Sequence, residues 1–90
     1  MWYFYVLQSL RDTNWFYKGS TNNLDKRLEE HNSGTCHSSC PYKPFRLVYY
    51  EAYLYEFAAR IRESAVKTSG SVSTPLLKRI RDSLDVREKL

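Results

Sequence analysis

The sequence predicts a small α+β protein in which one antiparallel sheet of three strands is flanked by three helices. Strand-forming residues are concentrated in three runs, at 2–7, 15–19 and 45–54, and helical periodicity follows the second and third runs. An aromatic content of 16% supplies the buried area that one compact core needs. Ninety residues are too few for two independent cores. We therefore expect a single domain over residues 1–84 and a frayed tail over 85–90.

The first two strands should form a hairpin. Residues 2–7 are all aromatic or aliphatic, residues 8–14 are largely polar and end in turn-forming residues, and residues 15–19 are again strand-like. Gly19 closes the second run, where backbone freedom or the close approach of another group would be useful.

A helix should follow at residues 24–31. Asn22 can cap its N-terminus, and Gly34 marks its end. Leu24 and Leu28 lie one turn apart, so we expect both to face the core.

The second half of the chain should contain one strand and two helices. Residues 45–54 are almost unbroken in their apolar character, which predicts a strand covered on both faces. A second helix should run from about residue 55 to residue 67, and a third should begin near Ser73 or Thr74 with Pro75 as its first helical residue. The expected buried stripe of the second helix is Phe57, Ala58, Ile61 and Ala65, and that of the third is Leu76, Leu77, Ile80 and Leu84.

The charge balance favours a polyanionic partner. Fourteen Lys and Arg against ten Asp and Glu give a formal net charge of +4, although many soluble domains carry a similar excess. Residues 60–81 contain six of these cations against the single acid Glu63. Such a segment can attract phosphates, and it can equally be a solvated helix face.

Several other classes of protein are disfavoured. No apolar stretch is long enough to span a bilayer, and the N-terminus does not resemble a signal peptide. Two cysteines do not suggest a disulfide scaffold, and neither a Walker loop nor a dinucleotide fingerprint is present. We expect a cytoplasmic protein that binds neither membranes nor a nucleotide cofactor.

Five features occur in an order that carries more weight than any one of them. The first strand contains Tyr3-Phe4-Tyr5, and the second ends in Tyr17-Lys18-Gly19. The next helix carries Arg27 and, one turn later on the same face, His31. The second long helix carries Glu63. In this order and on these elements, the features resemble the GIY-YIG nuclease superfamily, in particular its small stand-alone members, which are similar to the nuclease domain of the excision-repair UvrC subunit.

The resemblance implies metal-dependent hydrolysis of DNA phosphodiester bonds. Glu63 would hold one divalent ion, Mg²⁺ or Mn²⁺, since Mg²⁺ suits a single carboxylate supplemented by water and substrate oxygens. Arg27 would clamp the scissile phosphate. Tyr17 is the family's usual general base, and His31, with an ordinary pKa of about 6.5, is the rival base. Tyr5 would hold Tyr17 or a water molecule in place.

Further contacts with DNA are expected near the motifs and in the loop before the third strand. The candidate residues are Lys18, Ser20, Lys43, Arg46 and Lys67. Strand alternation should point Lys18 away from Tyr17. At this length, recognition of branched or damaged duplex in DNA repair or processing is more plausible than sequence-specific cutting.

Each of these residues also has a simpler interpretation. Glu63 has the spacing for a helix salt bridge with Arg60 or Lys67, and the tyrosines can be core aromatics. The run Cys36-His37-Ser38-Ser39-Cys40 suggests a zinc site, but it lacks the paired cysteine spacing of most such sites.

The chief alternative function is a nucleic-acid-binding module of the same fold that has lost catalysis. Many members of the superfamily place an Asn near the metal in the C-terminal region, whereas this chain has no Asn after Asn32. Thr68, Ser69 or Ser71 could take its place. A protein-interaction domain is the other alternative.

Overall fold

The computed structural model describes residues 1–35 and 39–85, and it confirms the expected α+β class and the order ββαβαα. The strands are β1 (Trp2–Ser9), β2 (Phe16–Thr21) and β3 (Phe45–Tyr53). The helices are α1 (Leu24–Ser33), α2 (Glu56–Thr68) and α3 (Gly70–Leu84), with a short 3₁₀ turn at Cys40–Tyr42. The predicted tail at 85–90 lies outside the described residues from 86 onward.

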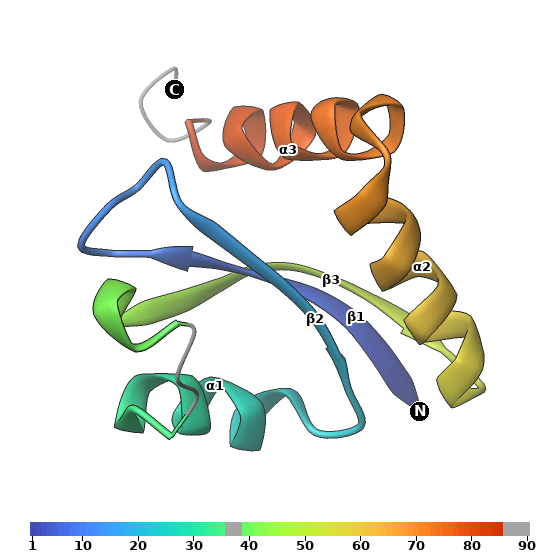
Figure 1. The fold of residues 1–90 in the computed structure, drawn as a ribbon, viewed down its shortest axis with the longest axis horizontal. Helices are drawn as coiled ribbons and strands as arrows, with labels where there is room; N and C mark the ends of the chain where they lie inside the picture. The colour runs from blue at the N-terminus through green and yellow to red at the C-terminus, as the bar shows by residue number, and fades with distance from the viewer. Residues whose placement is uncertain (36–38, 86–90) are drawn as a thin grey trace.

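The central strand is β1, which pairs antiparallel with both neighbours in the order β2-β1-β3. Its alternating side chains therefore enter two hydrophobic cores, one on each face of the same sheet. Phe4 and Val6 face α2 and α3, whereas Tyr5 and Leu7 face α1. Figure 1 shows α1 on one side of the sheet and α3 on the other, with α2 linking β3 to α3.

Both cores are built mainly from aromatic and branched aliphatic side chains. The core under α2 and α3 consists of Phe4, Val6, Phe16, Val66, Leu76 and Ile80. The core under α1 consists of Tyr5, Leu7 and Phe45, with Trp15, Tyr17, Leu24, Leu28, Tyr42 and Leu47 packed against it. The inward orientation of Leu24 and Leu28 confirms the stripe predicted for α1.

The third strand differs from its prediction because its two faces are only partly covered. Phe45 is buried, but Tyr50 and the adjoining Leu54 are exposed. Its apolar run therefore does not mark a strand that is covered on both faces along its whole length.

The N-terminal cap of α1 is Asn23 rather than Asn22. The Asn23 side-chain oxygen accepts a hydrogen bond from the Lys26 backbone N–H at 3.1 Å. At the other end, Gly34 has a φ of 85°, a left-handed conformation that favours glycine. The predicted helix end is thus confirmed and the predicted cap is shifted by one residue.

The buried face of α2 is also rotated from the predicted stripe. Phe57 and Ile61 are 66% and 60% exposed, while Ala59 and Val66 are buried. The small side chain of Ala59 lets the helix approach the sheet closely. The observed stripe is shifted by one residue along the helix, from Ala58 and Ala65 to Ala59 and Val66.

The third helix begins at Gly70, so Pro75 lies inside it rather than at its start. Proline cannot donate to the carbonyl four residues earlier, which here belongs to Ser71. Because Ser71 is exposed, water can satisfy that carbonyl. The predicted apolar face is confirmed, since Leu76 and Ile80 are buried. No helix in residues 1–35 or 39–85 has the length and apolar character to cross a membrane.

Candidate active site

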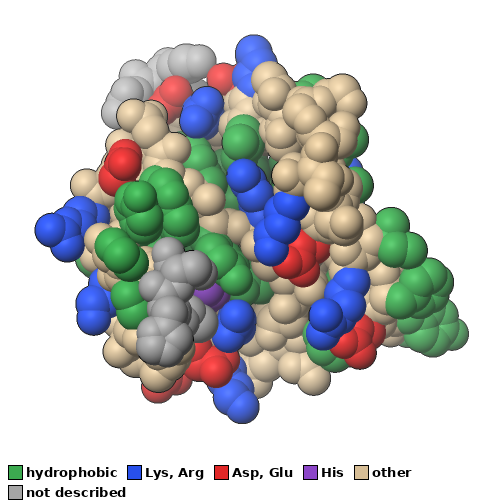
Figure 2. All heavy atoms as spheres, in the orientation of Figure 1, with side chains coloured by type: hydrophobic (Ala, Val, Ile, Leu, Met, Phe, Trp, Pro, Cys, Tyr) green, Lys and Arg blue, Asp and Glu red, His purple; other side chains and the backbone are tan. Residues whose placement is uncertain are grey.

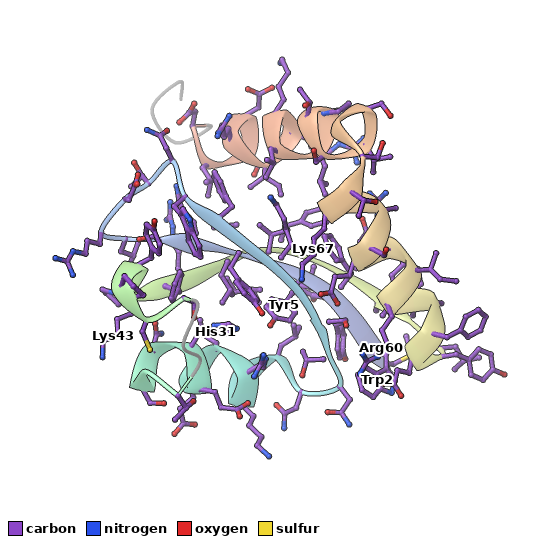
Figure 3. The ribbon with its side chains drawn as sticks, in the orientation of Figure 1. Trp2, Tyr5, His31, Lys43, Arg60 and Lys67 are labelled. Carbon is purple, nitrogen blue, oxygen red and sulfur yellow. The ribbon has the colours of Figure 1, made fainter. Side chains whose placement is uncertain are left out.

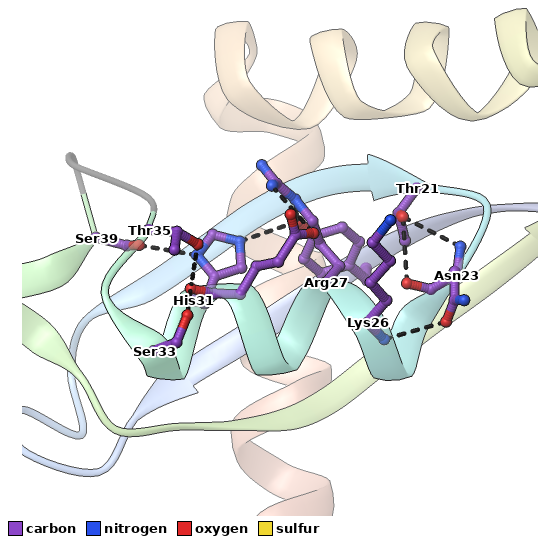
Figure 4. Close-up of polar contacts among 10 residues, drawn as sticks. Thr21, Asn23, Lys26, Arg27, His31, Ser33, Thr35 and Ser39 are labelled. Atoms are coloured by element: carbon purple, nitrogen blue, oxygen red, sulfur yellow. Dashed lines mark hydrogen bonds and ion pairs between the residues drawn. The ribbon is translucent and has the colours of Figure 1, made fainter.

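The Tyr5 hydroxyl connects the central strand to α1. Arg27 Nε donates a hydrogen bond to it at 3.3 Å, and His31 Nε2 lies 3.2 Å from it. The other ring nitrogen of His31, Nδ1, lies 2.8 Å from Ser39 Oγ. Figure 4 shows Arg27 and His31 side by side on α1, with Ser39 beyond the ring. Arg27 and His31 therefore reach one point, as their spacing predicted.

Burial determines which side chains in this series of hydrogen bonds carry protons. It raises the pKa of Tyr5 above the ordinary value of a phenol, although the hydrogen bond from Arg27 lowers it. Burial and then the positive charge of Arg27 lower the pKa of His31 to about 4. At neutral pH the phenol is protonated and the imidazole is neutral. In a neutral imidazole one ring nitrogen donates and the other accepts, so the His31 ring donates one of its hydrogen bonds with Tyr5 and Ser39 and accepts the other.

Tyr17 and Gly19 of β2 pack directly against the hydrogen-bonded side chains of Tyr5 and His31. The ring centroid of Tyr17 lies 4.3 Å from that of His31 and 6.2 Å from that of Tyr5. A Cβ atom on residue 19 would lie 2.6 Å from the Tyr5 hydroxyl oxygen, closer than real contacts allow. Gly19 is therefore required by a close approach, as the sequence suggested, although β2 continues to Thr21.

Glu63 of α2 is held at the edge of β2. Ser20 Oγ donates to one of its carboxylate oxygens at 2.6 Å, and Lys67 Nζ donates to the other at 2.6 Å. Burial raises the pKa of this carboxyl, but the hydrogen bonds from Lys67 and Ser20 outweigh it and bring the pKa below its ordinary value. Glu63 is thus ionised at neutral pH.

The residues around Tyr5 and those around Glu63 lie on opposite faces of β2 and come together at this strand. Ser20 faces α2, while Tyr17 faces α1. Because β2 is an edge strand, side chains of α2 can pass around it. Lys67 does so, since its Nζ bonds Glu63 and lies 5.8 Å from the ring centroid of Tyr17 (Figure 3). The acid therefore borders the cluster of aromatic rings and is not on a remote side of the molecule.

A family model described as the GIY-YIG catalytic domain matches residues 1–71. The chain belongs to the GIY-YIG family. At the level of the family this domain is a nuclease that cleaves DNA phosphodiester bonds, generally with a divalent metal. A search of curated proteins found no match.

The GIY-YIG family implies a metal ion, and the chemistry around Glu63 fits one. No three His, Cys, Asp or Glu side chains gather within the described ranges, so a bound ion would depend on Glu63 and on water. Mg²⁺ keeps several waters when protein carboxylates bind it. The Lys67 ammonium already shows that a cation fits against this carboxylate.

The surface beside Glu63 is hollowed. A depression of about 280 Å³ is lined by Arg60, Glu63, Ser64, Lys67 and Thr68. The hydroxyl of Thr68, one candidate for the family's missing Asn, donates to the Ser64 carbonyl at 2.7 Å. Thr68 thus borders the depression, with its hydroxyl bonded within the helix.

Two of the five predicted DNA-contacting residues lie beside Glu63. Ser20 and Lys67 both hydrogen-bond its carboxylate, as described above, whereas the other three residues lie elsewhere. Lys18 pairs with Val6 on the α2 side of the sheet and so points away from Tyr17, as predicted. Lys43 lies beside Gly34 at the end of α1. Arg46 donates to Gln8 at 2.8 Å, on the sheet face opposite α1.

The cations of residues 60–81 do not form one patch. Arg60 pairs with Glu56, Arg62 with Glu51, Lys67 with Glu63 and Lys78 with Asp82. Figure 2 shows basic and acidic side chains together between α1 and α2 rather than a continuous basic surface. The basic character of this segment is therefore largely paired within the protein.

Ser39 is the site residue that sequence reasoning missed. It is fully buried and positions the His31 ring. A histidine whose helix face points into the protein needs a hydrogen-bond partner for each ring nitrogen. This requirement was the one signal in the sequence that could have pointed to a partner such as Ser39. Because Tyr5 and Ser39 engage both nitrogens, His31 offers no lone pair to a zinc ion in this arrangement. Cys36 and His37 of the suggested zinc run lie outside the described residues.

Proposed function

We propose that this GIY-YIG domain is a divalent-metal-dependent endonuclease that hydrolyses DNA phosphodiester bonds. The convergence of Tyr5, Tyr17, Arg27 and Glu63 around residues 17–20 of β2 carries the proposal. These groups come from four separate elements, and the salt bridge of Glu63 with Lys67 does not by itself require that Glu63 lie beside the cluster of Tyr5, Tyr17 and Arg27.

Arg27 is proposed to bind the phosphate that is cleaved. Its side chain is partly exposed, with Glu30 at 3.7 Å, an ion pair that is weak at a protein surface. A guanidinium can bind two phosphate oxygens in directed hydrogen bonds. Because Tyr5 holds Nε, the plane of the group is fixed before DNA arrives, which lowers the entropic cost of binding.

Tyr17 is the residue we propose to hold the attacking water and, in its phenolate form, to accept the proton that the water loses. It is partly exposed, and within residues 1–35 and 39–85 no hydrogen bond engages its hydroxyl. His31 is fully buried and its pKa of about 4 makes it a weak base. We assign His31 a positioning role, in which it orients the Tyr5 hydroxyl and supports the ring of Tyr17.

Glu63 is proposed to hold the divalent ion. When bound, such an ion supplies a Lewis acid that offsets negative charge on the phosphate. Ser20 fixes the carboxylate from the strand, so that its position depends on both α2 and β2. Lys67 adds a positive charge next to Tyr17, where it can contact the DNA backbone.

The proposed substrate is DNA recognised by shape, such as a junction, a flap or a damaged duplex, in repair or processing. The cations at the site are suited to sugar-phosphate contacts, which position DNA without reading its sequence.

A plasmid-nicking assay with Mg²⁺ or Mn²⁺ tests the proposal. Glu63→Ala should lower the nicking rate by at least about 100-fold, and branched DNA should be cut faster than linear duplex. Glu56→Ala is the matched control, because Glu56 also forms an i,i+4 pair on α2 but with Arg60 at the surface. Equal rates for wild type and Glu63→Ala would remove Glu63 from the mechanism. Salt-dependent DNA binding without any metal-dependent cleavage would instead identify a binding module.

A further inference from the structure

The Lys67 ammonium lies against the carboxylate that is proposed to bind the metal ion. Its Nζ lies 2.6 Å from Glu63 Oε2, while Ser20 Oγ lies 2.6 Å from Oε1. Both oxygens of the carboxylate are therefore engaged within the protein. A divalent ion would bind such an oxygen at about 2.0–2.1 Å, against the repulsion of the neighbouring ammonium group.

The Lys67–Glu63 pair differs from the other i,i+4 pairs of the helices. The Glu63 side chain is 21% exposed, compared with 46% for Glu56 and 56% for Asp82. Its carboxylate is also fixed from β2, and the Lys67 ammonium lies over the ring of Tyr17. These contacts from other elements hold the lysine in the site, whereas surface pairs depend on helix spacing alone.

We propose that Lys67 is the resting counter-cation of Glu63 and that the divalent ion and Lys67 exchange places on this carboxylate. The inference rests on the proposed function, since it requires Glu63 to be the metal ligand. The exchange keeps the half-buried carboxylate neutralised in both states. It also makes the affinity of the site for the ion depend on how readily the lysine leaves.

The displaced ammonium has a destination within reach. Lys67 has a flexible four-carbon side chain, and its Nζ already lies next to Tyr17, where we propose that it contacts the DNA backbone. A DNA phosphate would give the released ammonium a new anionic partner. Metal binding and DNA binding are therefore expected to assist each other through this one side chain.

The test is Mn²⁺ binding without DNA, measured by electron paramagnetic resonance of the free ion, so that the readout does not depend on turnover. Lys67→Met removes the charge but keeps much of the side-chain volume. It should tighten Mn²⁺ binding by about fivefold, which corresponds to the upper range for a partly exposed ion pair. Lys78→Met is the matched control, because it breaks the i,i+4 pair with Asp82 on α3, and it should leave Mn²⁺ binding unchanged.

A second comparison separates this inference from the proposed function. If Glu63→Gln abolishes Mn²⁺ binding but Lys67→Met binds Mn²⁺ no more tightly than wild type, then the exchange is wrong and the metal site stands. If Glu63→Gln binds Mn²⁺ as well as wild type and as well as Lys67→Met, then both the exchange and the role of Glu63 as metal ligand are wrong. Circular dichroism establishes that each variant is folded before binding is measured.

Discussion

The buried His31 should make the stability of the protein fall in mild acid. In the folded protein its pKa is about 4, while in the unfolded chain it should return to about 6.5. Above pH 6.5 the ring is neutral in both states and does not affect the balance. Between pH 6.5 and pH 4 the unfolded chain takes up a proton that the folded protein does not. The free energy of unfolding must therefore decrease as the pH falls through this window.

The size of the effect follows from the difference between the two pKa values. The fall from 6.5 to about 4 is about 2.5 pH units, and at about 1.36 kcal/mol per unit this gives roughly 3 kcal/mol. Small domains are typically stable by about 5–15 kcal/mol. The titration of one ring could thus remove a large part of the stability of this protein by pH 4.

Urea unfolding followed by tryptophan fluorescence at pH 7, 6, 5 and 4 measures this loss. The comparison is with His31→Asn, and with His31→Gln if the first variant does not fold. Neither has a titrating group at this position, so the stability difference between wild type and variant should shrink by roughly 3 kcal/mol from pH 7 to pH 4. Contributions of Glu51 and Glu63, whose pKa values are lowered, occur in both proteins and cancel. Parallel pH profiles would refute the buried, neutral state of His31.

Three further substitutions test the packing around the site and the sheet. Gly19→Ala should destabilise the protein by about 1–3 kcal/mol, because its Cβ would meet the Tyr5 hydroxyl at 2.6 Å; thermal unfolding measures the loss. Gly70→Ala has no atom within 4 Å of the new Cβ and should be neutral or stabilising by up to about 1 kcal/mol, so equal losses in both variants would contradict the steric argument. Glu51→Gln should cost about 1–3 kcal/mol in urea unfolding, because the carboxylate accepts hydrogen bonds from Arg62 and two tyrosines; an unchanged midpoint would show that these bonds contribute little.

The part of the site that depends on local periodicity could be predicted from the sequence. Alternation along β2 points Lys18 away from Tyr17, and helix spacing places Arg27 and His31 together, as the structure shows. These relations depend only on the repeat of a strand or a helix. They do not require knowledge of how distant elements pack.

The features that sequence reasoning missed depend on contacts between distant elements. The rotation of α2 depends on its packing against the sheet, which buries Ala59 rather than Phe57. The burial of His31 depends on where the loop after α1 places Ser39. Helix spacing suggested that Glu63 and Lys67 could pair, but not that the pair would lie beside Tyr17. Packing of this kind is not encoded in a short window of residues.

The pairing of β1 with β2 is regular over six residue pairs, whereas the irregularity at Val6 and Leu7 occurs only toward β3. A slip of one residue between β1 and β2 would turn Tyr17 toward α2 and Lys18 toward α1, because side chains alternate. Insertions or deletions in the turn before β2 should therefore abolish activity even in variants that still fold, while similar changes in the connection before β3 should be tolerated better. The unbroken ladder beside Tyr17 thus sets the spacing of the groups that we propose to be catalytic.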